Sequence, residues 1–524
     1  MRRSCSRPHR QWHTLLQTQR RALFGSLVFV CVSTIQGSAQ TSTQENLAQQ
    51  VQQLTDAMNR TQTQLEQTQQ QMEEMRTQLT ALRQKMAAAG METAPAQPPE
   101  QPAEELAAQV DSLREQQAML KSQVATQEQT KVESESKYPV KLSGLILLNG
   151  FANTKQVDIP STPTLAIGGG GSTGASIRQT VLGLDARGPH LFGARSHADV
   201  RVDFDGTSQS GGGASNGTYY SDIGLLRLRT AHATLDWEHT QAFFSLDRPI
   251  ISPNQPSSLT AIAIPALAWS GNLWSWNPQV GVTHDLPLSN SQRLRLQAAL
   301  IDVSDAPVQY SASTAINTIS VISQPSAAER SRWPGVETRI ALLGTQKEDG
   351  AQLGFGGYFS PHRTISGTNF DAWAGTLDYR QPLPARLEFM GSFYRGQALG
   401  GLGGGGYKDY GYRPDLDEPG NFYFREFDAV GGWAQLKERF SERLEFNGAF
   451  GIDNVPATQL RPYADAYTSY YQNVARNRTF TGNVIYSPSA YLLFSLEYRR
   501  LETSPVNFPT AVSNIIGVAA GYKF

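Results

Sequence analysis

The chain has 524 residues, a formal net charge of -1, and 17% charged and 9% aromatic residues. A protein that binds nucleic acid through its phosphates needs a basic balance, which this composition lacks. Nucleic acid is therefore excluded as the expected partner.

Residues 1–39 are predicted to be a secretory signal peptide that is cut after Ala39. Residues 22–35 form an apolar run, shorter than a transmembrane helix, that follows two arginines and precedes small residues. An uncleaved anchor helix is the alternative. Cleavage would remove Cys5 and Cys31, so we expect a mature chain without disulfide bonds or cysteine metal sites.

Residues 40–90 are predicted to form a coiled coil. Apolar residues recur with constant 4-3 spacing, at Leu47, Val51, Leu54, Met58, Leu65, Met72, Met75, Leu79, Leu82 and Met86. At about 1.5 Å per residue this repeat makes a rod of about 60 Å. Its flanks show no charge pattern for a foreign partner, which favours self-association. Thr61 and Thr68 weaken the seam and leave the copy number open.

Two further segments separate the rod from the rest of the chain. Residues 91–103 are rich in proline, which predicts an extended linker. Residues 104–138 carry a second, shorter heptad run followed by a polar link.

Residues 139–524 are predicted to form an all-β transmembrane barrel of about sixteen antiparallel strands. Helix signals end at Pro139, and short segments of alternating polar and apolar residues follow, such as 195–205. Arg or Lys on a lipid-facing side costs roughly 2–4 kcal/mol at the membrane midplane, so the charged face of each segment is expected to line a wet interior. A soluble β-sandwich is the alternative, but its polar faces meet bulk water on an open sheet.

The connections between these segments alternate between tight turns and long loops. Seven turns and eight loops join sixteen strands and place both ends of the barrel on one side, the periplasmic side in an outer-membrane barrel. The final stretch, residues 511–524, alternates and ends on Phe524. This ending is typical of the last strand of outer-membrane barrels, and Phe524 is predicted to act as an assembly signal.

The charged positions of the alternating segments predict the lining of a pore. They are Arg201, Asp203, Asp205, Arg293, Arg295, Glu337, Arg339, Arg443, Glu445, Glu497 and Arg499. Opposed charges in a wet pore create a transverse field and select solutes by size and charge.

The third long loop, residues 248–276, is a candidate constriction. After Arg248 it has no ionisable side chain, and it contains Trp269, Trp274 and Trp276. A loop this apolar is poorly placed in open water. It is expected either to fold into the barrel and narrow the pore or to lie at a subunit contact.

The remaining sequence motifs do not indicate a catalytic or ligand-binding site. The glycine-rich stretches 168–171 and 400–406 lack the Gly-Lys-Ser/Thr of a phosphate-binding loop and are predicted to be flexible outer loops. The 8 histidines show no paired metal-ligand spacing. We therefore predict no catalytic residue, no metal site and no cofactor.

The whole layout resembles the DcaP-like porin family. The barrel is entered by Val140-Lys141-Leu142-Ser143-Gly144, and further matching stretches are 178–184, 265–272 and 278–280. The resemblance implies a trimeric outer-membrane channel with a periplasmic coiled coil that passes small, often anionic solutes such as dicarboxylates.

Three classes of function remain open on the sequence: a diffusion channel, a structural protein that tethers envelope layers through its rod, and a barrel enzyme. The mixed charges favour a channel, and loops and strand ends add arginines near the mouth, at Arg248, Arg363, Arg395, Arg413, Arg425, Arg461, Arg476 and Arg478. These arginines predict a preference for small carboxylates. The alternative is that they pair with neighbouring acids and stiffen the wall. The expected partners are the lipid bilayer, further copies of the chain and small anionic solutes.

Overall fold

The computed structural model describes residues 139–206, 225–308, 325–344, 350–415, 422–464 and 470–524. The predicted signal peptide, coiled coil, proline-rich linker and second helical segment, residues 1–138, lie outside the described residues. No helix in the described ranges is long and apolar enough to cross a membrane.

One antiparallel sheet closes on itself to form a barrel, because β1 pairs with β19 along one edge and with β2 and β3 along the other. Segments β2 and β3 follow one another along β1, so the 17 segments of the sheet make sixteen strands around the barrel, as predicted. The segments are β1 (Val140–Asn153), β2 (Ser172–Ser176), β3 (Val181–Leu191), β4 (Ala194–Gly206), β5 (Leu225–Asp236), β6 (Thr240–Asp247), β7 (Asn277–Ser289), β8 (Gln292–Ile301), β9 (Gly335–Gly344), β10 (Gln352–Arg363), β11 (Asn369–Leu383), β12 (Leu387–Gln397), β15 (Asp428–Arg439), β16 (Leu444–Asn454), β17 (Val474–Tyr486), β18 (Leu492–Pro505) and β19 (Ala511–Lys523).

Short elements lie in the long connections. A separate hairpin is formed by β13 (Tyr410–Pro414) and β14 (Phe422–Glu426). The helices are α4 (Ala327–Ser331), α5 (Ala457–Leu460), η1 (Gly400–Leu402), η2 (Gly405–Tyr407), η3 (Arg461–Tyr463) and η4 (Tyr470–Asn473).

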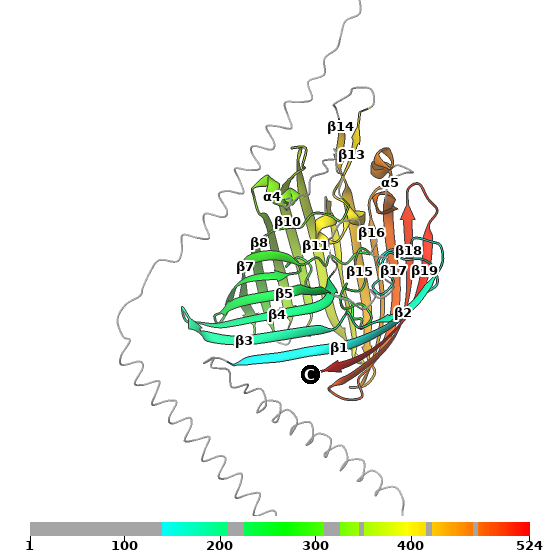
Figure 1. Cartoon of the computed structure of the whole chain (residues 1–524). Coiled ribbons are helices and arrows are strands. Elements are labelled where there is room, and N and C mark those ends of the chain that lie inside the picture. Colours follow the sequence, from blue (N-terminus) through cyan, green and yellow to red (C-terminus); the bar gives the residue numbers. More distant parts are fainter. Residues whose placement is uncertain (1–138, 207–224, 309–324, 345–349, 416–421, 465–469) are drawn as a thin grey trace, which may run out of the picture. The chain divides into compact units, whose positions relative to one another are not determined.

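The tight connections gather at one end of the barrel, here called the turn end, where β19 also finishes (Figure 1). The opposite end, called the loop end, carries the hairpin β13–β14. The prediction that turns and loops alternate is confirmed, because adjacent strands such as β3 and β4 are joined by two residues, Phe192 and Gly193.

Alternation along each strand produces the two faces of the wall. Across β7, β8 and β9, Val280 pairs with Leu300 and Leu300 with Val336, and this row lies on the outer surface. The neighbouring positions point inward, where Ala299 pairs with Glu337, which is fully buried. Apolar side chains therefore face outward toward lipid and polar ones inward, which is the inverse of a soluble sandwich.

Candidate functional site

The third loop, residues 248–276, lies inside the barrel. Side chains from strands on several sides of the interior bind its backbone. Asn149 Nδ2 donates to the Leu259 carbonyl at 3.0 Å, and Thr376 Oγ1 donates to the Ile251 carbonyl at 3.1 Å. Ser257 is bound twice: its carbonyl accepts from Asn483 Nδ2 at 2.8 Å, and its N–H donates to Gln435 Oε1 at 2.7 Å. These four side chains stand on β1, β11, β17 and β15. The loop therefore crosses the interior of the barrel and does not lie only at a subunit contact.

Arg248 stabilises the start of this loop. Its guanidinium donates to the carbonyls of Ser252 at 3.4 Å, Pro253 at 3.3 Å and Asn254 at 3.3 Å. Burial lowers the pKa of the Arg248 guanidinium below its ordinary value, and the charge of Asp247 opposes that shift. Arg248 therefore organises the loop backbone.

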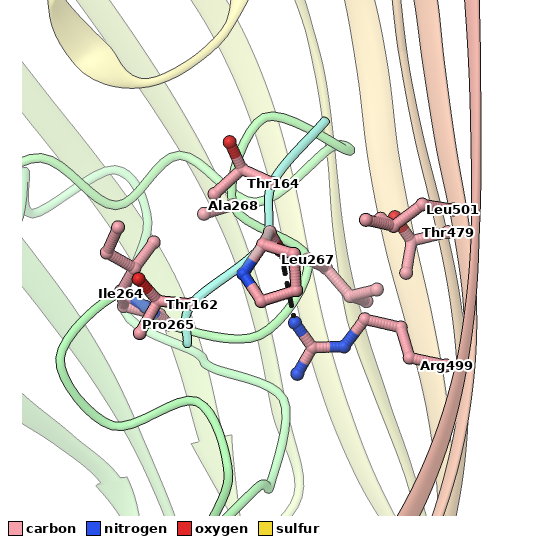
Figure 2. Close-up of a pocket in the computed structure, with 10 residues that line it drawn as sticks. Thr162, Thr164, Ile264, Pro265, Leu267, Ala268, Thr479, Arg499 and Leu501 are labelled. Atoms are coloured by element: carbon pink, nitrogen blue, oxygen red, sulfur yellow. Dashed lines mark hydrogen bonds between the residues drawn. The ribbon is translucent and has the colours of Figure 1, made fainter. Parts of the chain in front are cut away.

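Three loops meet at a buried junction around Trp269. The Trp269 ring stacks on Tyr407 at 4.2 Å between centroids, and Tyr407 Oη shares a hydrogen bond of 2.7 Å with Thr164 Oγ1. Figure 2 shows Thr162 and Thr164 of the first loop beside residues Ile264 to Ala268 of the third, with Arg499 reaching toward them from the wall. Arg499 Nη1 donates to the Pro163 carbonyl at 3.4 Å.

The glycine-rich stretch 400–406 is also buried inside the barrel, so the prediction of a flexible outer loop is wrong. Asp453 Oδ2 accepts from Gly406 N at 2.7 Å, and Asp453 Oδ1 accepts from Gly405 N at 3.2 Å. Gly403, Gly405 and Gly406 have φ values of 93°, 64° and 57°, which glycine adopts without strain. Sequence reasoning missed this loop because Asp453, which accepts from its amides, is distant in the sequence.

A buried lysine closes the glycine loop, which we define as residues 398–409. Lys408 Nζ donates to the carbonyls of Gly406 and Val474, the latter at 2.7 Å. Burial lowers the pKa of Lys408 to about 7, while the charge of Asp453 raises it. Burial likewise raises the pKa of Asp409 to about 6.

The inward side chains of β3–β8, here called the open wall, form solvated ion pairs. Arg295 makes a bidentate pair with Asp285 at 2.7 and 2.8 Å, and Arg293 approaches the same carboxylate at 3.4 Å. Arg201 lies 2.6 Å from Asp185 and 3.7 Å from Asp199. The side chains of Arg201, His232, Asp285 and Arg295 remain between 21 and 31% exposed.

The predicted residues Asp203 and Asp205 stand on the same wall beside two arginines that sequence reasoning missed. Arg227 binds the buried Asp203 at 2.6 and 2.9 Å, and Arg229 lies 3.7 Å from the same carboxylate. Both guanidiniums lie 5.1 Å from the centre of the Trp276 ring. The alternation Arg227-Leu228-Arg229 was the available signal, although a register shift between β4 and β5 at this level obscures the pairing.

The inward side chains of β9–β12 and β15–β18, here called the packed wall, are covered by the loops. Arg339 makes a bidentate pair with Asp378 at 2.8 and 2.7 Å, with side-chain exposures of 3 and 0%. Glu497 accepts from Arg499 and from Ser258 of the third loop, both at 2.5 Å. Glu337 is fully buried next to this loop, beside the backbone amides of Ile250 and Ile251.

Two predicted lining residues lie away from the middle of the barrel. Arg443 is exposed in the tight turn before β16, because the strand begins one residue later than the alternation indicated. Glu445 lies near the turn end, 3.7 Å from Lys437 and 3.8 Å from Arg439. Arg443 is therefore misplaced as part of the pore wall.

The predicted mouth arginines are also divided between the two faces. Arg395 is exposed on the outer face of β12, paired across the sheet with Gly375 and Val430. Arg478 pairs with Glu502 at 2.5 Å on the outer face of β17. The prediction that these two arginines lie at the mouth is wrong, because each lies two positions from a lipid-facing phenylalanine of its own strand, Phe393 or Phe480. Arg476, two positions before Arg478, lies on the same outer face.

A sixteen-stranded barrel with an apolar exterior, a charged interior and loops folded inside has the architecture of outer-membrane porins. The structure of the outer-membrane channel DcaP of Acinetobacter baumannii is similar, with a TM-score of 0.53 and 15% identity over 75% of this chain and 99% of that one. The predicted resemblance to the DcaP-like porins is thus confirmed at the level of fold.

Two more distant structures are an anion-selective porin from Comamonas acidovorans and OprB of Pseudomonas putida. The first has a TM-score of 0.44 and 9% identity and covers 74% of this chain and 100% of that one. The second has a TM-score of 0.42 and 9% identity and covers 74% and 94%. No family model and no curated protein sequence matches this chain.

Proposed function

We propose that the protein is a passive outer-membrane channel whose solute path follows the open wall. The observation that carries this proposal is the difference in exposure across the interior. Arg201, His232, Asp285 and Arg295 keep contact with water, whereas Arg339, Asp378 and Glu497 are buried under loops. Paired charges that line a solvated passage provide the polar, size-limited lining of a diffusion channel.

We further propose small anions, in particular mono- and dicarboxylates, as the preferred solutes. At two places on the open wall arginines outnumber carboxylates: Arg293 and Arg295 share Asp285, and Arg227, Arg229 and Arg178 surround Asp203 and Asp205. Each cluster therefore has an excess positive charge. Guanidinium groups bind carboxylates through planar two-point contacts, and such contacts in sequence would pass an anion along the wall.

Trp276, at the end of the third loop, is proposed to narrow this path. Trp276 lies against both Arg227 and Arg229, and Nη1 of Arg229 is buried without a hydrogen-bond partner in the described part of the chain. Elsewhere Arg201 lies between Asp185 and Asp199, so the sign of the field alternates along the wall. We therefore assign selectivity to the two arginine clusters and constriction of the path to the third loop.

The assembly is proposed to be a trimer with the coiled coil of residues 40–90 in the periplasm. The support is the sequence resemblance together with the heptad seam, which lies outside the described residues. Analytical ultracentrifugation of the full-length protein in detergent, with and without residues 40–90, measures the subunit number. A monomer in both preparations contradicts this part of the proposal.

The double substitution Arg293→Glu and Arg295→Glu tests the anion preference. It leaves three carboxylates together at this level of the open wall, so the reversal potential in a salt gradient should move toward cation preference and dicarboxylate flux should fall. Flux of a neutral sugar of similar size is the internal control and should change little. An unchanged reversal potential in a protein that still inserts and conducts rules out this site of selectivity.

A further inference from the structure

A small group of polar side chains stands on the outer, lipid-facing surface near the loop end. On β17 the inward residues Asn477 and Thr479 bond the third loop, so Arg478 between them points outward. On β18 Arg499 and Leu501 are buried on the inner side, so Arg500 faces outward between them. These positions were not among the expected outward residues, because arginine is costly on a lipid-facing wall.

The two arginines are organised by one carboxylate. Arg478 Nε donates to Glu502 Oε2 at 2.5 Å, and Arg500 Nε donates to Glu502 Oε1 at 2.7 Å. The side chains of Arg478 and Arg500 are 39 and 42% exposed. Because each guanidinium uses its Nε in this pair, its terminal Nη groups are left outside the pair, and the cluster has an excess positive charge.

A third arginine extends the cluster along β17. Arg476 precedes Arg478 by two residues, so it lies on the same face, and it is paired across the sheet with Asn454 and Ser504. Its Nε is buried and has no hydrogen-bond partner within the described ranges. The outer surface here thus presents more cationic donors than the single acid Glu502 can neutralise.

The position of the cluster relative to the membrane follows from the residues below it. The rings of Phe450 and Phe480 lie 4.6 Å apart, and Phe480 is two positions from Arg478 toward the turn end. Tyr498 lies two positions before Arg500 on β18, also toward the turn end. Aromatic rings of this kind mark the level where the hydrocarbon layer meets the headgroups. The arginine cluster therefore stands at headgroup level, where a charged side chain costs roughly 0–1 kcal/mol.

An apolar groove lies farther toward the turn end on the outer face of β17 and β18 and of their neighbours β19 and β1, and begins at Leu496, four positions from Arg500 along β18. It has a volume of about 600 Å³, and its walls are formed by Leu148 and Gly150 of β1, Val484 of β17, Phe494 and Leu496 of β18, and Val518 of β19. A cationic head region above an apolar groove matches a molecule with an anionic headgroup and a hydrocarbon tail. A free phosphate ion would match only the upper half.

We propose that Arg478, Arg500 and Arg476 bind a phosphate group of a phosphorylated lipid in the outer leaflet, with an acyl chain in the apolar groove. Guanidinium groups bind phosphate oxygens in a bidentate manner, and basic pockets on membrane proteins bind anionic headgroups. Glu502 accepts from both guanidiniums and offsets part of their positive charge. This site lies on the outer face of the barrel and is separate from the proposed solute path.

Native mass spectrometry of the full-length protein in detergent tests this site with bisphosphorylated lipid A, dephosphorylated lipid A and inorganic phosphate as probes. The wild type should retain bisphosphorylated lipid A and neither of the other two. Loss of charged hydrogen bonds in the double variant Arg478→Gln and Arg500→Gln should weaken lipid A binding at least about tenfold. Arg395→Gln, which removes an isolated outward arginine, is the matched control and should leave binding unchanged.

A second variant, Glu502→Gln, keeps the assay informative if the double variant does not fold. It removes the only acid of the cluster, so it should bind lipid A at least as tightly as the wild type. Equal retention of dephosphorylated lipid, equal weakening by Arg395→Gln, or loss of binding in Glu502→Gln overturns the proposal. A change in subunit number with unchanged lipid binding also overturns it, and assigns the face to a contact between copies.

Discussion

The open wall and the packed wall contain the same kind of strand but form different environments. Arg295 with Asp285 and Arg339 with Asp378 are bidentate pairs with nearly identical distances. The first pair has side-chain exposures of 31 and 21%, the second 3 and 0%. The difference comes from the third loop, because it bonds Thr376 and the Tyr379 carbonyl on either side of Asp378 and leaves the pair of Arg295 and Asp285 in contact with water.

This comparison shows that alternation decides only which face of a strand a charge occupies. Whether the charge serves solute selection or structural stability depends on what covers it. In a solvated site an ion pair contributes little to stability, whereas breaking a buried pair leaves an uncompensated charge. Variants on the two walls separate these two roles.

Breaking the buried pair of the packed wall should have the largest effect. Arg339→Ala leaves the carboxylate of Asp378 buried without its cation, so the free energy of unfolding should fall by roughly 3–5 kcal/mol. Urea unfolding of the folded barrel in detergent, followed by its gel shift on heating, measures this change. Arg295→Ala is the control on the open wall and should lose at most about 1 kcal/mol. Equal losses for the two variants would show that the walls do not differ in the way described.

Removing the ring at the junction of the three loops should come next. Trp269→Ala deletes the stack on Tyr407 and the packing beneath it, which costs about 3 kcal/mol for a buried aromatic side chain. Because the loops would separate locally, single-channel conductance should increase. Trp333→Ala, at a highly exposed tryptophan, is the control and should leave both stability and conductance unchanged. A stable Trp269→Ala variant with wild-type conductance would contradict the role of the junction.

The glycine loop should give the packed wall a pH dependence through Lys408. The pKa of Lys408 in the folded chain is about 7, below its ordinary value of 10.5, so the unfolded chain binds more protons between these values. Stability should therefore rise with pH across this window and fall as pH drops toward 7. The charged group that acts on Lys408 is Asp453.

Lys408→Met isolates this contribution. The variant leaves the carbonyls of Gly406 and Val474 without a donor, which costs about 1–3 kcal/mol, and it loses the ionisable group. The temperature of the heat-induced gel shift, measured at pH 7 and pH 10, should rise more in the wild type than in the variant. Parallel changes in the two proteins would place the pH dependence elsewhere.

The smallest effect is expected at Arg443. This arginine is exposed in a turn, so Arg443→Gln should change stability by less than about 0.5 kcal/mol and leave the reversal potential at its wild-type value. The measurement is the same salt gradient that tests Arg293 and Arg295. A clear shift in reversal potential would return Arg443 to the solute path.

Much of the barrel could be predicted from the sequence, because every strand that crosses the lipid needs apolar side chains on its outer face. Alternation located the strands and turns, and it put Arg201, Arg295 and Arg339 on the inner face. It could not predict the course of the loops, since Gln435 and Asn483 bind the third loop across the interior from positions far along the chain. It also missed Arg229, whose place depends on a register shift.

The other positions in the site could not be predicted, because they depend on residues far away in the sequence or on where a strand begins. The exposed position of Arg443 depends on where β16 begins, and the outward position of Arg478 on counting from Phe480 along the strand. The glycine loop looked flexible because its aspartate ligands could not be assigned without the fold. The predictions for residues 1–138, and the assembly role of Phe524, stay predictions.

The seam between β1 and β19 has a consequence for how the barrel forms. Gly144 and Phe524 exchange two backbone hydrogen bonds of 3.0 Å, and Lys155 bonds Ser513 at 3.2 Å although the two are 358 residues apart. Contacts between residues so far apart in the sequence can form only after the hairpins between them have formed, and closing so long a loop is slow. A side chain at position 144 would meet the Phe524 ring at 2.6 Å. A bulky residue there should therefore trap an open sheet with two unpaired edges, a late intermediate prone to aggregation.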